Sequence, residues 1–345
     1  MSPTNPKTQH WVPNFYLRQF ATLDTINKKK GKQQVHVQSV ENAAKYFLSN
    51  TSGIAAENHL YTLVDPETGK KDWRIEHKFA EYEKLIAKLW PVFLEWDLPF
   101  SGGLQDDYKR IPHGDVLRKA LSIFMTQLHV RNPYNKKVIE KEIKKQLIEI
   151  RKLPKDPSGK PLPFTVKFAS GERVDVNDTS DWENFESSDP EFINSVFLSS
   201  IEVPLGNLNK IFYNKTWQII VAKNKQFLTC DRPIVVEDES IGMERSRIYF
   251  PLSSTRCLIM SDKDSGVEGY YHAVEEFIPS INLLTIQTAS AQVYSQADPI
   301  HAMKDVDLLC QNLLLSKDLG VNQKILTSDT RSTKNRVARG KRRFT

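Results

Sequence analysis

The sequence predicts an α+β protein, with a helix-rich body built from both halves of the chain and a small, mainly antiparallel sheet between about residues 217 and 261. Long segments with an apolar residue at every third or fourth position predict the helices. Short segments rich in β-branched and aromatic residues, separated by short polar gaps, predict the sheet. No fixed-period repeat is visible, which argues against a solenoid. A chain of 345 residues that is 39% hydrophobic can bury a sizeable core.

The amino-terminal part predicts one short helix and two strands. The segment HWVPNFYLRQFA (10–21) places aromatic and leucine side chains where a helical turn would bury them. Residues 35–39 alternate as a strand does, and residues 60–63 predict a second strand that ends in the turn sequence DPETG. Between the helix and the strands, four lysines form a basic run that we interpret as a loop: Lys28, Lys29, Lys30 and Lys32.

Three helices follow. The first is predicted over 75–96, where Pro91 should bend or break it because proline removes a helical hydrogen bond. The second is predicted over 115–131 and is stopped by Pro133, since the residue before a proline disfavours the helical conformation. The third is predicted over 136–152, with apolar residues on one side and lysines and glutamates on the other.

The second half begins at a clear break in the chain. Residues 153–163 contain four prolines and a glycine and cannot continue a helix. A hairpin around Ser170 and Gly171, an acidic surface loop and two helices separated by Pro204 are predicted next. The predicted strands of the sheet then begin at Trp217, Gln226, Pro233, Arg247 and Arg256, and the last two predicted helices cover 274–294 and 300–315.

We interpret residues 1–330 as a single large α+β domain with a possible surface excursion at 153–190, because the candidate site described below draws on both sides of the break. Residues 331–345 are interpreted as a disordered basic tail. The net charge is +6, but this segment carries seven basic residues and no acid, and the rest of the chain has 41 basic and 42 acidic residues, a net charge of −1. Such a tail could bind a phosphate backbone, although most such tails are only solvated ends.

The sequence argues against several classes of protein. The three cysteines, Cys230, Cys257 and Cys310, form no CxxC pair, so neither a disulfide scaffold nor a zinc ribbon is indicated. The start of the chain lacks the order of a signal peptide, and no stretch reaches the roughly 18 to 20 apolar residues of a spanning helix. We therefore expect a soluble cytoplasmic protein with no membrane partner. The usual local motifs for dinucleotide binding, P-loop hydrolysis, zinc proteolysis and serine hydrolysis are also missing.

Three weaker groups of residues remain as candidates for chemistry. His10 and Arg18 lie in one short segment, where a helical turn could present imidazole and guanidinium to one anion. Their ordinary interpretation is an exposed histidine and an arginine paired with a carboxylate. Glu76 and Glu83 lie seven residues apart, on nearly the same helix face, and could bind a metal or position a water. More commonly such a face only meets solvent.

The third group is centred on Asp231, at the end of a predicted strand and before Pro233. A carboxylate held there by backbone donors could be an acid, a base or a metal ligand, or it could simply form a turn that stops the strand. Gln127 and Arg131 add polar groups beside the proline stop of the second helix. Asn282 lies inside an otherwise apolar helix, where a buried amide requires a partner.

The segment HWVPNFYLRQF resembles the opening motif of an uncharacterised, mostly bacterial family, domain of unknown function 4238. ENHLYTL, the helix with Glu76 and Glu83, QLHVRNP, FLTCDRP, YFPLS and INLLTIQTASAQVYS are similar to it too, in the same order over most of residues 10–296. One departure is Cys230, where the family more often has serine. The family name implies no reaction. The resemblance implies that five residues belong to one site: His10, Arg18, Gln127, Arg131 and Asp231.

An imidazole, carboxylates and two guanidiniums suit an anionic substrate. We therefore expect a phosphodiester- or nucleotide-directed hydrolase, a candidate nuclease or phosphoesterase in bacterial conflict or phage defence, with Mg²⁺ or Mn²⁺ as the metal if one is used. The alternative is a non-catalytic protein that binds nucleic acid or another partner through the basic residues of the tail. Five residues represent that tail: Arg336, Arg339, Lys341, Arg342 and Arg343.

Overall fold

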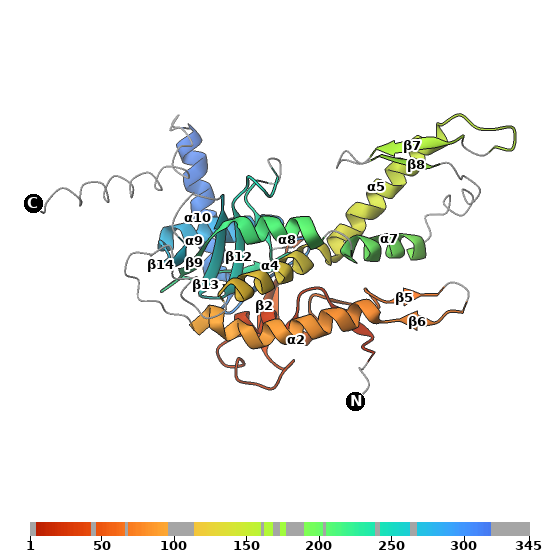
Figure 1. The fold of residues 1–345 in the computed structure, drawn as a ribbon. Coiled ribbons are helices and arrows are strands. Elements are labelled where there is room, and N and C mark those ends of the chain that lie inside the picture. Colours follow the sequence, from red (N-terminus) through yellow and green to blue (C-terminus); the bar gives the residue numbers. More distant parts are fainter. Residues whose placement is uncertain are drawn as a thin grey trace, which may run out of the picture.

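The computed structural model describes residues 5–42, 46–65, 68–95, 114–159, 162–167, 173–176, 190–202, 205–238, 242–262 and 268–318. It confirms the α+β class (Figure 1). The α-helices are α1 (Asn14–Leu17), α2 (Arg74–Glu95), α4 (Gly114–Val130), α5 (Pro133–Arg151), α7 (Pro190–Glu202), α8 (Leu205–Asn214), α9 (Ile278–Thr288) and α10 (Pro299–Asp318). Short 3-10 turns are η1 (Arg18–Phe20), η2 (Thr51–Gly53) and η4 (Glu275–Phe277).

The two larger sheets of the described residues have five and four strands. The five-stranded sheet has the order β11-β12-β13-β9-β14, and β14 runs parallel to β9 while the other pairs are antiparallel. Its strands are β9 (Thr216–Val221), β11 (Val235–Val236), β12 (Ile248–Ser253), β13 (Arg256–Ser261) and β14 (Gly269–His272). The predicted sheet is thus present, and β14 extends it beyond residue 261.

The four-stranded sheet corrects the prediction that all the later strands belong to one sheet. Its order is β10-β15-β2-β3, and all of its pairs are antiparallel. Its strands are β2 (Gln34–Ser39), β3 (Tyr46–Asn50), β10 (Thr229–Cys230) and β15 (Gln292–Ser295). The helix predicted over 274–294 was therefore wrong at its end, because the chain leaves α9 after Thr288 and residues 292–295 pair with both β2 and β10.

Two local predictions also differ from the structure. Pro91 does not break α2, which continues to Glu95, because Trp90 and Phe93 on either side of it are both buried in the core. Only Leu63 of the strand predicted over 60–63 is in a strand. The short strands pair as β1 (Thr8–His10) with β4 (Ala56–Asn58), β5 (Leu63–Val64) with β6 (Lys71–Asp72), and β7 (Phe164–Lys167) with β8 (Arg173–Val176).

The core joins the amino-terminal segment to both the helices and the five-stranded sheet. Trp90 of α2 meets Phe15 of α1 edge-on at 5.5 Å between ring centroids and Phe124 of α4 at 5.7 Å. Tyr16 stacks on Phe250 of β12 at 5.4 Å. Figure 1 shows α2, α4 and α8 beside this sheet, and α5 and the β7–β8 hairpin projecting from it. Aromatic contacts of this kind fix α1, which follows His10 closely in the chain, against α2 and α4.

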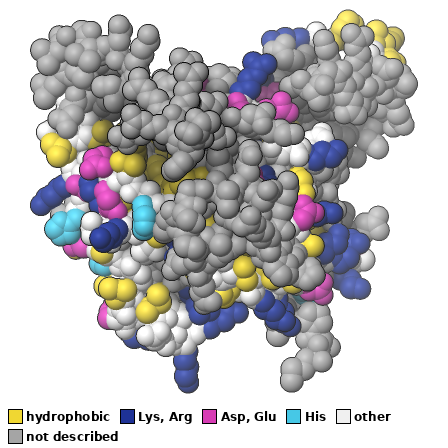
Figure 2. Space-filling view, turned by 60° about the vertical axis from the view of Figure 1, so that its left-hand side comes forward, with side chains coloured by type: hydrophobic (Ala, Val, Ile, Leu, Met, Phe, Trp, Pro, Cys, Tyr) yellow, Lys and Arg dark blue, Asp and Glu magenta, His cyan; other side chains and the backbone are white. Residues whose placement is uncertain are grey.

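The described surface is uneven in charge. Figure 2 shows Lys and Arg side chains concentrated along the lower part of the visible face and at its right-hand edge, with few acidic groups among them. None of the helices in the described ranges has the length and apolar character needed to cross a bilayer.

Candidate functional site

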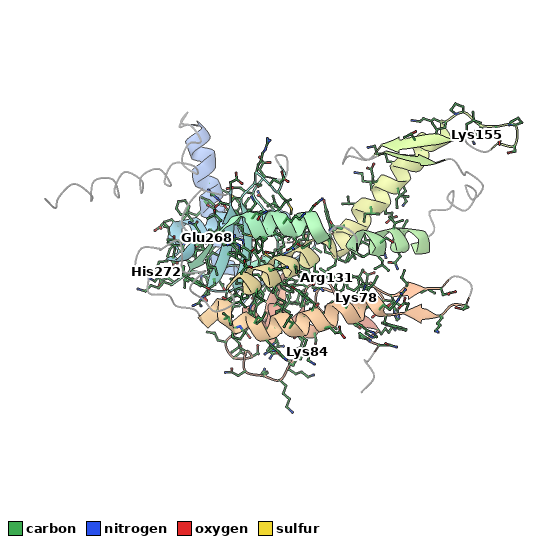
Figure 3. All side chains as sticks on the ribbon, viewed as in Figure 1. Lys78, Lys84, Arg131, Lys155, Glu268 and His272 are labelled. Atoms are coloured by element: carbon green, nitrogen blue, oxygen red, sulfur yellow. The ribbon has the colours of Figure 1, made fainter. Side chains whose placement is uncertain are left out.

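Arg131 is the centre of the candidate site. It directly follows α4, its side chain is fully buried, and Figure 3 places it between α4 and α2. Its Nη1 lies 2.7 Å from Oε1 of Glu83 on α2, and its Nε donates a hydrogen bond to the carbonyl of Trp11 at 3.0 Å. The guanidinium also lies 5.0 Å from the centroid of the Phe79 ring. One buried cation therefore connects the amino-terminal segment, α2 and the end of α4.

Tyr61 closes this cluster from the turn that follows β4. Its hydroxyl donates to the backbone carbonyl of Arg131 at 2.7 Å, and its ring meets Phe79 edge-on at 5.0 Å. Burial raises the pKa of Tyr61 well above its ordinary value, so this hydroxyl keeps its proton. Tyr61 thus acts as a hydrogen-bond donor that fixes the residue after α4.

Glu76 and Glu83 lie on the α2 face that meets Arg131, as their spacing predicts. Burial raises the pKa of Glu83, and the Arg131 guanidinium opposes that rise. Burial, and then the negative charge of Glu83, raise the pKa of Glu76 to about 7, again opposed by Arg131. Glu76 is half-buried and has no hydrogen bond or ion pair among the described residues. It is therefore a carboxyl group that changes its charge near neutral pH.

His10 ends β1, next to the Trp11 carbonyl that Arg131 contacts. Its Nε2 lies 3.2 Å from the carbonyl oxygen of Ser52 in η2. Because a carbonyl only accepts, Nε2 carries the hydrogen and Nδ1 carries the lone pair. Burial lowers the pKa of His10, the Ser52 carbonyl opposes this, and the positive charges of Arg131 and Lys30 lower it further. The imidazole is therefore neutral at neutral pH.

Asp231 follows β10 and is held by the link between α9 and β15. Its Oδ1 and Oδ2 accept hydrogen bonds from the backbone N–H groups of Ser290 and Ala291, each at 2.8 Å. Burial raises its pKa, and these two amides oppose the rise. The indole N–H of Trp11 donates to the Asp231 backbone carbonyl at 3.1 Å. Asp231 is thus placed near Arg131 through Trp11, but its side chain is occupied by long-range backbone contacts.

Three predicted binding residues differ in their surroundings. Asn282 accepts from the Leu228 amide at 2.9 Å and donates to the Gln226 carbonyl at 3.0 Å, so its side chain ties α9 to the segment before β10 and is not directed at the cluster. Arg18 makes no ion pair in the described part of the chain, and its buried Nε has no acceptor. Gln127 lies one helical turn before Arg131, and its buried Oε1 has no donor among the residues that the structure describes.

Two further predictions concern the basic tail and a metal ion. Arg336, Arg339, Lys341, Arg342 and Arg343 all lie outside the described residues. Within the described ranges, no three His, Cys, Asp or Glu side chains are arranged so that they could hold a metal ion. The described residues therefore do not provide a set of ligands that fits the Mg²⁺ or Mn²⁺ considered above.

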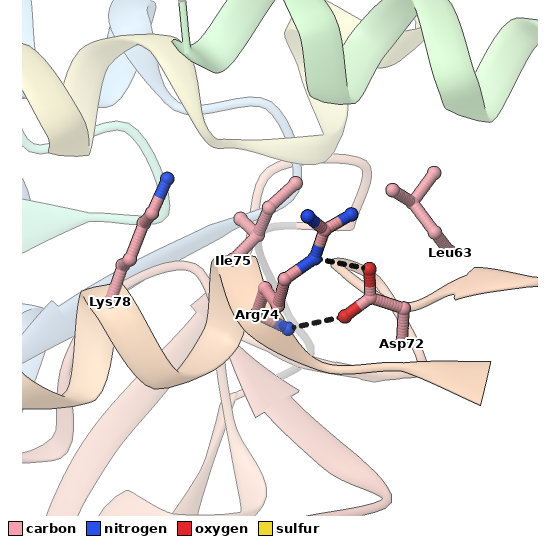
Figure 4. A pocket seen from close by; sticks show the side chains of 5 residues that line it. All are labelled: Leu63, Asp72, Arg74, Ile75 and Lys78. Atoms are coloured by element: carbon pink, nitrogen blue, oxygen red, sulfur yellow. Dashed lines mark hydrogen bonds and ion pairs between the residues drawn. The ribbon is translucent and has the colours of Figure 1, made fainter.

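A small pocket lies at the start of α2 (Figure 4). It is lined by Leu63, Asp72, Arg74, Ile75 and Lys78. Asp72 accepts from the backbone N–H of Arg74 at 2.9 Å and from its Nε at 2.6 Å, and the Arg74 side chain is 80% exposed. Glu76 does not line this pocket. The residues that line the pocket are thus different from those of the Arg131 cluster.

Three contact residues were not predicted from the sequence. Trp11 and Tyr61 occur in motifs that mark the family resemblance, HWVPNF and ENHLYTL, but nothing local indicates that both contact Arg131. Ser52 has no local signal, because it contacts His10 through its backbone carbonyl, a group that every residue has.

Comparison with known proteins identifies a family and no reaction. No curated protein and no solved structure matched the chain. The sequence model of one family, described as "Protein of unknown function (DUF4238)", matches residues 8–299. That range holds His10, Glu76, Glu83, Arg131 and Asp231. The chain belongs to the DUF4238 family.

Proposed function

We propose that this protein is a phosphodiester- or nucleotide-directed hydrolase in which His10 and Glu76 transfer protons beside the ion pair of Arg131 and Glu83. One observation carries the proposal: Glu76 is a half-buried carboxyl without a hydrogen-bond or ion-pair partner among the described residues. Burial and the charge of Glu83 raise the pKa of Glu76 to about 7, and shifts of this size are concentrated at functional sites.

The roles of the two groups follow from their opposite electrostatic surroundings. His10 has a lowered pKa and is neutral, which suits a general base, whereas Glu76 has a pKa of about 7 and keeps its proton in slightly acidic solution, which suits a general acid. In the proposed reaction, His10 takes a proton from water as the water oxygen attacks phosphorus. The bond from phosphorus to the leaving oxygen breaks, and Glu76 gives its proton to that oxygen. Solvent then returns the His10 proton to Glu76.

The sign of the local charge supports an anionic substrate. Arg131 and Lys30 both place positive charge near His10, as their effect on its pKa shows. The Arg131 side chain is fully buried, so the guanidinium acts on the substrate through its charge and not by direct contact. Developing negative charge on phosphorus-bound oxygens would be stabilised by this field.

A second candidate function is a non-catalytic protein that binds nucleic acid or another partner. Asp231 and Asn282 favour it, since the polar atoms of both side chains are taken up by backbone groups that hold the fold. Nuclease activity, a role in phage defence and cytoplasmic localisation stay predictions.

The test is a hydrolysis assay with the full chain on single-stranded RNA, single-stranded DNA, duplex DNA and nucleotides, each with Mg²⁺, Mn²⁺ or a chelator. We expect turnover of at least one substrate. Glu76→Gln should lower kcat by about 10² to 10⁴ because the amide has no proton to donate. Glu81→Gln, an exposed position on the same helix, is the matched control and should keep its activity. A folded wild-type protein that leaves every substrate intact would support the binding function and exclude the hydrolase.

A further inference from the structure

We propose that the lysine loop, residues 28–32, binds the phosphate backbone of a nucleic-acid strand and leads it to His10. This inference rests on the proposed hydrolase and deepens it, because it makes the substrate a polynucleotide and not a free nucleotide.

Ser52 joins the lysine loop to the candidate site. Its carbonyl oxygen accepts from Nε2 of His10 at 3.2 Å, and its hydroxyl donates to the carbonyl of Gly31 at 3.0 Å. The charge of Lys30 accordingly reaches the site, where it lowers the pKa of both His10 and Glu83. The lysine loop therefore lies next to the residue proposed to take the first proton.

The backbone of the lysine loop is held in one shape. Gln33, almost fully buried, donates from its amide to the carbonyl of Lys28 at 2.6 Å and accepts from the Gly31 N–H at 3.0 Å. The N–H of Lys32 donates to the carbonyl of Lys29 at 2.9 Å. Gly31 has φ +79°, which favours glycine, and a Cβ there would meet the Ser52 Cβ at 3.4 Å. Gly31 and the buried Gln33 thus hold the backbone of this turn in place against Ser52.

The lysine side chains are free to meet a ligand. Lys29, Lys30 and Lys32 are exposed, and none of them has an ion-pair partner among the described residues. Lys28 lies near Asp24, whose pKa it helps to lower. Three exposed cations without an ion pair among the described residues, spread along a turn, match the repeated charges of a phosphodiester chain, whereas a free nucleotide brings its phosphates to one point.

The experiment measures binding of the full chain to fluorescein-labelled oligo(dT) and oligo(U) of 20 nucleotides by anisotropy, at several salt concentrations. The test variant is Lys29→Gln/Lys30→Gln/Lys32→Gln. The matched control is Lys137→Gln/Lys141→Gln/Lys210→Gln, which removes the same charge from exposed positions on α5 and α8. Comparing oligo(dT) with oligo(U) shows whether the affinity differs between DNA and RNA.

We expect the loop variant to weaken binding about ten-fold or more at 100 mM salt and to reduce the slope of log K against log salt by about 2, since three phosphate contacts are lost at about 0.7 each. The control should change the dissociation constant less than about two-fold. Equal weakening by both variants, or none by the loop variant, would overturn the inference. Both variants should melt at the wild-type temperature.

The experiments distinguish a failure of the proposed hydrolase from a failure of the proposed nucleic-acid site at the lysine loop. If the loop variant loses binding selectively but the wild-type protein hydrolyses neither strand, no duplex DNA and no nucleotide, the lysine loop is a nucleic-acid site and the hydrolase is excluded. If the loop variant hydrolyses mononucleotides at the wild-type rate and the wild-type protein binds neither strand, the hydrolase stands and the inference about the lysine loop is wrong.

Discussion

At the scale of single residues, Glu76 gives the folded state its own dependence on pH. Its pKa rises from 4.5 to about 7 on folding, mainly through burial. Below pH 4.5 the carboxyl is protonated in both the folded and the unfolded states, so it does not lower the free energy of unfolding. As the pH rises from 4.5 to about 7, the unfolded state releases this proton while the folded state keeps it, so stability falls over this range and the loss is complete above it.

We expect Glu76→Gln to remove this penalty. Relative to wild type, the variant should gain about 2 to 3 kcal/mol in the free energy of unfolding at pH 8, and little at pH 4.5. Urea unfolding at the two pH values measures this. The exposed control Glu81→Gln should show no such pH dependence. A gain that is the same at both pH values would mean that the pKa of Glu76 is not raised in the folded protein.

Arg131 is expected to be among the residues most sensitive to substitution. Arg131→Met leaves the Glu83 carboxylate buried without its cation and the Trp11 carbonyl without its donor, and should cost about 3 to 5 kcal/mol at pH 8. The loss should be smaller at pH 5, because without Arg131 the pKa of Glu83 rises further and the carboxyl protonates.

The control for this substitution is Arg74→Met, which breaks an ion pair with Asp72 in which the arginine side chain is 80% exposed. That loss should stay within about 1 kcal/mol. Urea unfolding of both variants gives the comparison. If Arg131→Met and Arg74→Met lower the free energy of unfolding by similarly small amounts, the Arg131 cluster does not hold the amino-terminal segment, α2 and the end of α4 together.

How much of the site the sequence predicts depends on the kind of contact. The spacing of Glu76 and Glu83 places both on one helix face because that relation is local. The partner of Glu83 and the contact of Ser52 with His10 are long-range, and no periodicity indicates them. The order of the family motifs was the only sequence signal that joined His10, Arg131 and Asp231.

At the scale of elements, the link between α9 and β15 explains Asp231. The carboxylate accepts from two successive backbone amides at the point where the chain leaves the helix. Asp231→Asn replaces one acceptor oxygen by a donor that faces an N–H, and should cost about 1 to 3 kcal/mol.

Because this role is structural, kcat/KM of Asp231→Asn per folded molecule should stay within about two-fold of wild type. Thermal melting together with the hydrolysis assay measures both effects. An unchanged melting temperature with activity lost would instead make Asp231 a catalytic residue.

The region around α9 and β15 shows why some helices and strands were not predicted from the sequence. The long helices α2, α4 and α5 were predicted because their periodicity is strong over many residues. β15 follows α9 after a short link, and what makes it a strand is its pairing with β2, some 250 residues earlier in the chain. Likewise, Pro91 is tolerated in α2 because core packing on both sides outweighs one lost hydrogen bond.

At the scale of the whole molecule, the core and the site draw on the same distant segments. The main hydrophobic cluster includes Val12, Trp90, Phe124, Phe250 and Tyr294. The Arg131 cluster lies where the amino-terminal segment meets α2 and α4, so folding of the body and assembly of the site are expected to be coupled. The net charge of −1 outside the tail makes a local basic loop more significant than the overall charge of +6 suggests.

The most direct measurement is the pH dependence of kcat/KM for the substrate that the full chain hydrolyses, compared between wild type and Glu76→Gln. Because Glu76 must keep its proton to protonate the leaving oxygen, wild-type activity should fall as the pH rises through about 7. Glu76→Gln should be slower, without that alkaline decline. If the decline persists unchanged in Glu76→Gln, or the variant is as active as wild type, Glu76 is not the acid and the proposed mechanism is wrong.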